Sequence, residues 1–141
     1  MKKLVFLMAV LFLGVNIYAQ TGQVEVTVTG IKTDKGGNVR VGIYEKEGFP
    51  TVGQEIIGKD VEVKEGIITV LFEDVPVENY AIAVFQDKDM DGKLDSNLFG
   101  APTEPYGFSN NIYGRFGPPS FEDVSFDLED GKTVSKTINL E

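Results

Sequence analysis

The residues with the clearest capacity for chemistry form a run of alternate acids near the middle of the chain. The carboxylates are those of Asp87, Asp89, Asp91 and Asp95, with Gly92 at the sixth position and Lys93 at the seventh. Alternate side chains of a curling backbone converge on one centre, and the glycine permits the sharp turn that aims the next carbonyl inward. The spacing therefore predicts a Ca²⁺ loop in which the four carboxylates and the Lys93 carbonyl oxygen are ligands.

This loop lacks one ligand of the helix-loop-helix calcium motif. Its twelfth position is Leu98, where that motif has a bidentate Glu, and the residues that precede the loop read as a strand. We therefore expect the remaining ligand from a nearby position, with Asn97 and Glu104 as the candidates. The alternative interpretation is a solvated turn between strands, since Asp and Gly are common in turns.

The composition limits the other kinds of chemistry. The 141 residues include 22 acids against 13 Lys and Arg, for a net charge of −9, and contain no Cys, no His and no Trp. Nucleophile systems that need Cys or His, and zinc sites built on those residues, are thereby excluded. The acidic balance argues against a nucleic-acid partner, and an all-oxygen site selects a hard cation. A carboxylate hydrolase that uses a pair such as Asp95 and Glu104 is a remaining enzymatic alternative.

The first 19 residues have the layout of an export signal. Lys2 and Lys3 precede an uncharged apolar run from Leu4 to Val15, and a small residue, Ala19, lies at a plausible cleavage point. The 16 residues from 4 to 19 fall short of the roughly 20 that a membrane span needs, and no Cys follows for a lipoprotein anchor. We predict cleavage after residue 19, a periplasmic or extracellular product without a membrane span, and one domain over residues 20–141. Cleavage removes two lysines and no acid, which changes the net charge from −9 to −11.

The elements that must position the acidic loop read as short strands. Apolar and polar residues alternate over 24–29, 39–43 and 124–128, and further apolar runs cover 61–63, 67–72, 80–85 and 134–140. No stretch after the first 19 residues has a convincing helical period of apolar residues. Seven short strands predict an all-β, seven-stranded antiparallel β-sandwich with immunoglobulin-like or transthyretin-like topology.

One strand opening supports this fold. Pro76 begins a turn that leads through Asn79 into Tyr80, the first residue of the apolar run 80–85. A tyrosine in this place is typical of the corner in which the hydroxyl bonds back to the backbone of the preceding turn. We therefore interpret Tyr80 as structural, and Asn79 as the residue that tolerates a positive φ.

The segment 96–120 has no clean strand or helix pattern, yet it is rich in aromatic residues. One interpretation is a platform for a ligand or partner, formed by Tyr106, Phe108, Tyr113 and Phe116 with Asn110, Asn111 and Arg115 as polar contacts. The other is a small accessory core that covers the open end of the sandwich. We favour the second interpretation, because the chain lacks Trp, the residue that most often stacks on sugars.

These motifs together carry a family resemblance over nearly the whole of residues 20–141. The carriers are Phe72-x-Asp74-Val75-Pro76, the run 80–84, the acidic loop 87–95, the segment 99–111 with its Glu104-Pro105-Tyr106-Gly107-Phe108-Ser109 core, and Gly117-Pro118-Pro119-Ser120-Phe121. They resemble the exported bacterial family known as domain of unknown function 2141. The resemblance implies an exported β-sandwich and no established activity.

The sequence thus favours an exported, non-enzymatic β-sandwich in which a Ca²⁺-binding Asp loop orders the aromatic segment for contact with a protein partner or a glycan. Two alternatives remain open. The chain could be a structural or assembly module of the cell envelope that docks through its strand edges, or a small carboxylate hydrolase.

Overall fold

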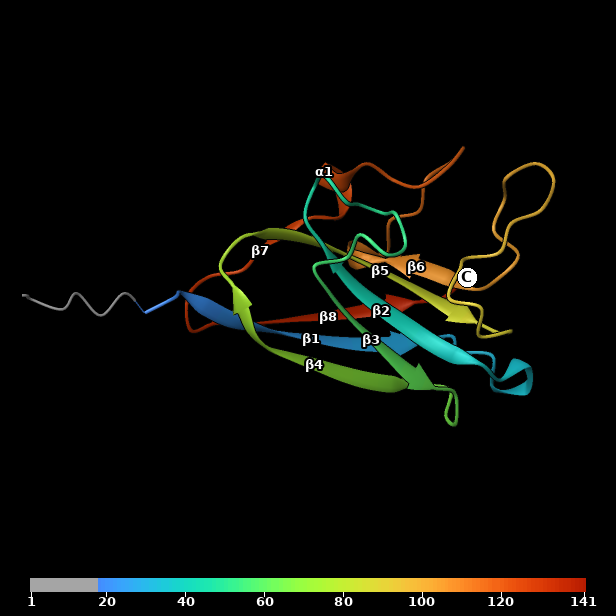
Figure 1. Ribbon diagram of the computed structural model, residues 1–141, viewed down its shortest axis with the longest axis horizontal. Helices are drawn as coiled ribbons and strands as arrows, with labels where there is room; N and C mark the ends of the chain where they lie inside the picture. The colour runs from blue at the N-terminus through green and yellow to red at the C-terminus, as the bar shows by residue number, and fades with distance from the viewer. Residues whose placement is uncertain (1–17) are drawn as a thin grey trace, which may run out of the picture.

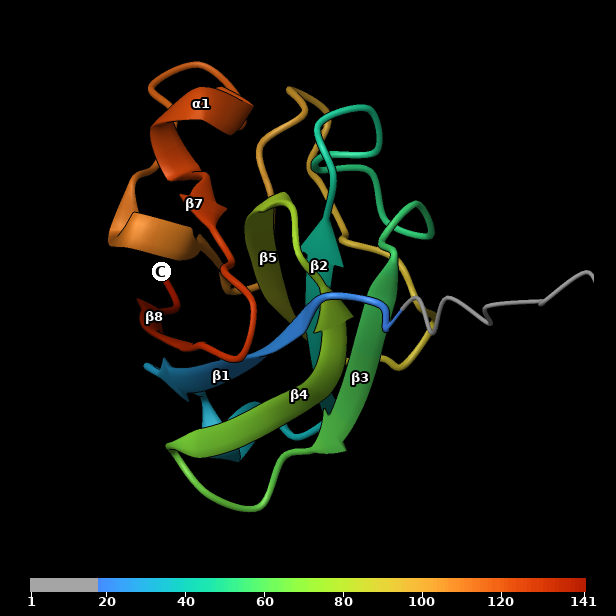
Figure 2. The same cartoon turned by 90° about the vertical axis from the view of Figure 1, so that its left-hand side faces the viewer.

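A computed structural model describes residues 18–141, and the predicted export signal falls almost entirely outside them. Eight strands form two sheets, as Figures 1 and 2 show. The three-stranded sheet has the order β4 (Ile68–Pro76), β1 (Thr21–Thr29) and β8 (Thr133–Asn139). The five-stranded sheet has the order β3 (Ile57–Glu62), β2 (Asn38–Tyr44), β5 (Asn79–Asp87) and β6 (Tyr106–Phe108), with β7 (Phe126–Asp127) also paired to β5.

Helical structure is limited to three single turns in the described chain. They are the 3-10 turns Thr33–Lys35 and Ser109–Asn111 and the short helix α1, Phe121–Val124. No helix among residues 18–141 is long and apolar enough to cross a membrane. The prediction of an all-β fold is therefore confirmed.

The inward residues of both sheets form one core. Val24, Val26 and Val28 of β1 are fully buried, and so are Val39 and Val41 of β2. The alternation of these residues with polar neighbours places one face of each strand inward, because successive side chains of a strand point to opposite faces. Burial of these faces against each other holds the two sheets together, since apolar burial is the main favourable term in folding.

Two details of the strand arrangement differ from the prediction. The structure has eight strands rather than seven, because residues 106–108, in the segment without a strand pattern, form an additional short strand beside β5. The predicted strand 124–128 is shortened to residues 126–127, since a helical turn occupies 121–124. The pairing of β1 with β8 is parallel, whereas the predicted sandwich was antiparallel. A parallel pair needs a crossover, and here the whole of the second sheet lies between the two strands in sequence.

The tyrosine corner is confirmed. The hydroxyl of Tyr80 donates a hydrogen bond of 2.8 Å to the Pro76 carbonyl oxygen. The positive φ in this region belongs to Asp74, at 54°, and not to Asn79 as predicted. Asn79 instead begins β5, and its amide donates to the Asp127 carboxylate of β7.

A second hydrophobic cluster covers the outer face of the five-stranded sheet. Its buried members are Ala81, Phe108 and Val124, and the partly buried rings packed against them include Phe49 and Phe121. Phe49 comes from the loop between β2 and β3, and its ring contacts both Phe108 and Phe121 edge to face. This cluster anchors the β2–β3 loop and the segment between β6 and β7 to the sheet. In Figure 1 the tip of the segment between β6 and β7 projects from the molecule, and so does the loop between β5 and β6.

Candidate metal centre and neighbouring groove

The acidic loop begins at the last residue of β5. Asp87 is buried, with 5% of its surface exposed, and its carboxylate accepts hydrogen bonds from the backbone N–H of Asp91 (3.2 Å) and of Gly92 (2.8 Å). Gly92 has a φ of 79°, which favours glycine, so the chain can curl back over Asp87. The Arg40 guanidinium of β2 donates to the Gly92 carbonyl oxygen from outside the curl, at 3.3 Å.

The curl brings three of the predicted ligands together. Carboxylate oxygens of Asp87, Asp89 and Asp91 lie within 4.8 Å of one another. Asp89 and Asp91 are exposed, and each carboxylate accepts one backbone N–H of the loop, at 3.3 and 2.8 Å. Asp89 also belongs to a second group, with Asp95 and Glu104, whose oxygens meet the same 4.8 Å limit. The two groups share one carboxylate and form a continuous acidic cluster.

Glu104 lies beneath this cluster and closes the loop. Only 3% of its surface is exposed. One carboxylate oxygen accepts the Lys88 N–H at 2.8 Å and the other accepts the Asp95 N–H at 3.1 Å. A single side chain therefore connects the start and the end of the acidic loop.

The cluster has the chemistry of a hard-cation site. Two oxygens on opposite sides of a Ca²⁺ ion are roughly 5 Å apart, given metal–oxygen distances of 2.3–2.6 Å. The oxygens of each group all lie within 4.8 Å of one another, close enough to reach a single ion of that size. A carboxylate oxygen that accepts one N–H still has a free lone pair, so the internal hydrogen bonds leave room for an ion. Among residues 18–141, the structure thus brings five of the predicted ligands into two adjoining groups, Asp87 with Asp89 and Asp91, and Asp89 with Asp95 and Glu104. Their role as metal ligands stays a prediction.

The other two candidate ligands have different surroundings. The Asn97 side-chain oxygen accepts from the backbone N–H of Phe99 and of Ala101, so it holds the turn at the loop tip. Lys93 follows the curl, where its N–H bonds to the Asp91 carboxylate. Its carbonyl oxygen stays a predicted ligand.

Two residues that position the loop were not identified from sequence. Gln86 is fully buried, and its amide bonds to Lys32 through both N–H and C=O and to the Gly36 carbonyl oxygen, at 2.7–2.9 Å. Gly37 lies so close that a Cβ there would be 2.1 Å from the Asp87 carbonyl oxygen. The only sequence signal for Gln86 was its place directly after the apolar run 80–85, where a polar residue continues a buried strand. No sequence signal indicated the close approach of Gly37 to Asp87.

The aromatic residues of the predicted platform divide into two sets. Tyr106, Phe108 and Tyr113 pack in the second hydrophobic cluster, with ring centroids of Tyr106 5.8 and 6.0 Å from those of the other two. The Tyr113 hydroxyl donates to the Asn139 carbonyl oxygen of β8, and burial is the main cause that raises the pKa of this phenol. Phe116 instead lies at a loop tip with 98% of its surface exposed. An accessory core, the favoured interpretation, therefore describes three rings out of the four, but it covers the outer face of the five-stranded sheet rather than the open end of the sandwich.

The two predicted amide contacts are used within the chain. Asn111 donates to the Thr137 carbonyl oxygen and accepts the Asn139 N–H, so it pairs with the free edge of β8. Asn110 donates toward the Asp123 and Ser125 carbonyl oxygens and accepts from Lys136. Both asparagines have positive φ values, 64° for Asn110 and 51° for Asn111. Their amides hold the loop against the sheet.

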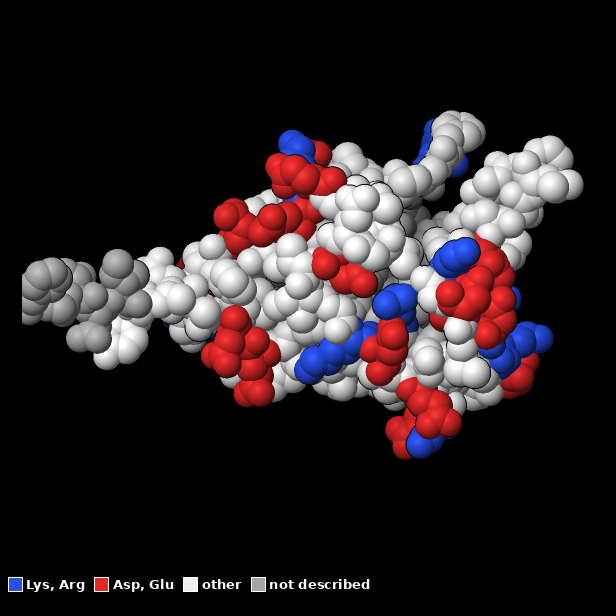
Figure 3. All heavy atoms as spheres, viewed as in Figure 1, with Lys and Arg blue, Asp and Glu red and all other residues white. Residues whose placement is uncertain are grey.

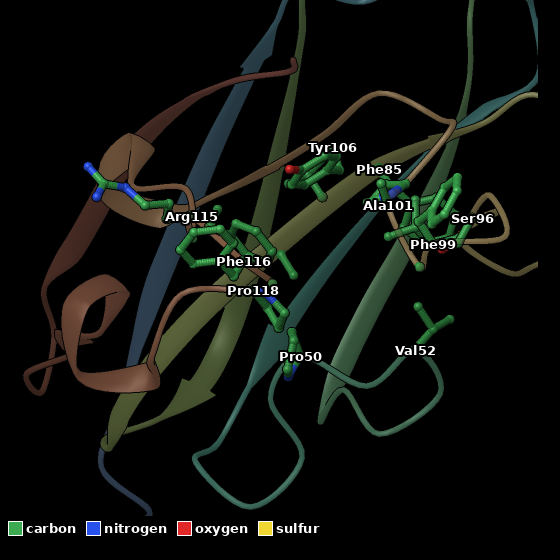
Figure 4. Close-up of a pocket in the computed structure, with 18 of the residues that line it drawn as sticks. Pro50, Val52, Phe85, Ser96, Phe99, Ala101, Tyr106, Arg115, Phe116 and Pro118 are labelled. Atoms are coloured by element: carbon green, nitrogen blue, oxygen red, sulfur yellow. The ribbon is translucent and has the colours of Figure 1, made fainter.

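A groove of about 520 Å³ lies between two projecting loop tips, over the outer face of the five-stranded sheet (Figure 4). Its floor includes Ala83 and Tyr106, one wall is the tip that carries Phe99, and the other is the tip that carries Phe116. Phe99 is 95% exposed. Arg115, the only charged residue among those that line the groove, lies at its rim. Figure 3 shows one group of carboxylates at this end of the molecule, with others spread over the rest of the face, and beside it two largely uncharged tips.

Fold and site together define an all-β, two-sheet protein with a partly buried acidic cluster whose oxygens could hold a metal ion. The chain belongs to the bacterial family described as "Uncharacterized protein conserved in bacteria (DUF2141)", which it matches over residues 26–136. The matched range contains the acidic cluster and both tips of the groove. No curated protein and no solved structure matches the chain significantly.

Proposed function

We propose that this protein is an exported, non-enzymatic binding module whose acidic loop holds Ca²⁺. The ion orders the adjoining segment 96–104, and the end of the molecule that carries this segment contacts a protein partner or a glycan. Export rests on the charge and hydropathy pattern of residues 1–19. Free Ca²⁺ is plentiful outside the cytoplasm, so even a weak site would be filled there.

The observation that carries this proposal is the pair of acidic groups that share Asp89. Asp87 and Glu104 supply buried oxygens beneath, and the exposed carboxylates of Asp89 and Asp91 and the half-buried carboxylate of Asp95 complete the two groups. Five carboxylates this close repel one another without a cation, because each charge interacts with its neighbours at only a few ångströms. A bound ion removes that repulsion and favours the ordered loop.

The same geometry supports a non-enzymatic role. Oxygens of Asp95 and Glu104 lie within 4.8 Å, a separation that does not by itself argue against paired-carboxylate chemistry. However, both oxygens of Glu104 face backbone N–H groups, and neither acid lines the groove. Paired catalytic acids need a substrate between them, and this pair faces its own loop.

Thermal unfolding in Ca²⁺ and in EDTA tests the metal site. Binding to the folded state alone stabilises by about 2.7 kcal/mol when the ion is at 100 times its Kd, so we expect a Tm several degrees higher in Ca²⁺. Asp89→Ala should abolish the increase, because it removes a ligand from both groups and breaks only one long hydrogen bond. Asp34→Ala, in an exposed acid remote in sequence from the cluster, is the matched control and should keep it. Equal Tm values for the unaltered chain in Ca²⁺ and EDTA would refute the proposal.

A further inference from the structure

The groove between the two loop tips has features of a small-molecule site that the acidic cluster does not explain. Its volume of about 520 Å³ falls in the range of ligand pockets. Phe99 and Phe116, on opposite walls, are almost fully exposed, at 95% and 98%. Two solvent-exposed aromatic rings thus lie on either side of one groove. Exposed apolar groups that gather in one place mark interaction sites.

The floor of the groove is apolar because of the residue types on β5. Ala83 is small and faces outward from the sheet, among larger rings that include Tyr44, Phe85 and Tyr106. A larger side chain at this position would fill the space that the groove occupies. The floor and walls together suit the apolar body of a small ligand rather than a polar sugar ring.

The charges of the groove differ from those of the rest of the chain. The chain has 22 acids, yet no carboxylate lines the groove, and Arg115 supplies the single charge. In the described part of the chain, Arg115 has no ion pair and its side chain no hydrogen bond, and it is exposed, with its guanidinium directed away from the cavity in Figure 4. An exposed side chain of this kind changes rotamer in nanoseconds, so it can turn toward an anion at the rim.

The groove also offers a hydroxyl that no protein group uses. The Tyr106 hydroxyl takes part in no hydrogen bond among residues 18–141, and in Figure 4 it points to the side on which Phe116 and Arg115 lie. A polar end of the groove, with one donor hydroxyl and one cation, thus faces an apolar end formed by Ala83, Val52 and Phe99.

We propose that this groove binds a small amphipathic carboxylate, with its apolar chain on Ala83 between the Phe99 and Phe116 rings and its carboxylate at the Arg115 rim. The proposal rests on the proposed function in one respect, since the segment with Phe99 is the one that the ion would order. Decanoate has the required chemistry, and decan-1-ol is its uncharged counterpart.

The test is displacement of anilinonaphthalene sulfonate, an amphipathic fluorescent anion, by decanoate below its micelle concentration. Phe99→Ser and Phe116→Ser should each weaken decanoate about tenfold, since burial of a large apolar side chain is worth roughly 1.4 kcal/mol or more. Leu98→Ser is the matched control for the first variant, because Leu98 is fully exposed on the same tip but does not line the groove. All three changes are at exposed positions, so folding should be unaffected.

The carboxylate is tested separately. Arg115→Gln should weaken decanoate about two- to fivefold, the range for an exposed ion pair, and leave decan-1-ol unchanged. Lys132→Gln, an exposed cation elsewhere, should change neither. Equal losses of affinity for decan-1-ol and decanoate in Arg115→Gln would refute the role of Arg115 in binding the carboxylate. Equal losses of decanoate affinity in Leu98→Ser and Phe99→Ser would refute the groove as the binding site and indicate a general apolar surface, such as one that contacts lipid.

Titrations in Ca²⁺ and in EDTA separate this proposal from the metal site. Weaker decanoate binding in EDTA supports the link between ion and groove wall. Equal decanoate affinity in Ca²⁺ and in EDTA supports the groove as a binding site and refutes its link to the ion. Absence of saturable binding in Ca²⁺, in a chain whose Tm rises with Ca²⁺, would refute the groove alone.

Discussion

The Glu104→Gln variant separates the structural role of the buried carboxylate from its role as a metal ligand. Glutamine has the same shape but offers one oxygen acceptor and one NH₂ donor. One of the two loop amides, Lys88 N–H or Asp95 N–H, would then face a donor instead of an acceptor. Because Glu104 is only 3% exposed, water cannot easily replace the lost partner.

The expected cost follows from these two hydrogen bonds. An unsatisfied buried donor costs about 1–3 kcal/mol, and bonds to a charged acceptor are at the upper end of that range. The loop can detach locally, which limits the loss in global stability to the free energy that orders the loop. The change also removes one of the five clustered charges and so part of their repulsion in EDTA, which offsets part of this loss. We therefore expect a loss near the lower end of the range, about 1 kcal/mol, in the free energy of unfolding in EDTA, with faster amide exchange at Lys88 and Asp95.

Urea unfolding and amide hydrogen exchange, both in EDTA, measure the structural role alone. Glu65→Gln, in an exposed turn, is the control and should stay within about 0.5 kcal/mol of the unaltered chain. Urea unfolding repeated in Ca²⁺ then measures any further loss of stability that is due to weaker ion binding. If Glu104→Gln had the same free energy of unfolding as the unaltered chain in EDTA, with unchanged exchange at both amides, the structural role of the Glu104 carboxylate would be refuted.

Two further predictions concern other buried groups. Gln86→Met leaves the Lys32 and Gly36 backbone partners of the Gln86 amide unpaired, so we expect a loss of about 3 kcal/mol in urea unfolding, and a loss under 1 kcal/mol would contradict the assigned role. Burial, with the Glu55 carboxylate nearby, raises the pKa of Tyr44 above its ordinary 10.0. The folded state thus keeps the neutral phenol while the unfolded state ionises, and this stability, fully present below about pH 10, is lost as the pH rises further. Tyr44→Phe should reduce the alkaline loss in urea unfolding across that range, and an unchanged slope would contradict this.

The strands and the tyrosine corner could be predicted because their signals are local. Alternation over a few residues determines which face of β1 or β2 is buried, and the corner needs only Pro76 and Tyr80 at a fixed spacing. The parallel pairing of β1 with β8 could not be predicted in this way. It joins strands more than 100 residues apart, and the hydrophobic pattern of a strand does not specify the direction of its partner.

The aromatic segment shows a similar limit. The sequence shows five aromatic rings in 96–120 but does not indicate which of them the sheet will cover. Ala81 and Ala83 of β5 leave space on the outer face, and that space takes Tyr106, Phe108 and Tyr113. The rings outside that space, Phe99 and Phe116, are left on the tips, so the division between core and surface depends on the small residues of a distant strand.

The position of Glu104 joins the acidic cluster to the groove. The segment between Asp95 and Glu104 is closed by the Thr103 N–H bond to the Asp95 carbonyl oxygen and by a bridge between Ser96 and Pro102. These two contacts make the segment one narrow loop whose base is the acidic cluster and whose tip carries Phe99. We expect a change in the separation of the carboxylates at the base to change the direction of the tip. An ion that draws Asp89 toward Asp95 and Glu104 would hold that wall in one position, and the width of the groove would depend on whether the ion is bound.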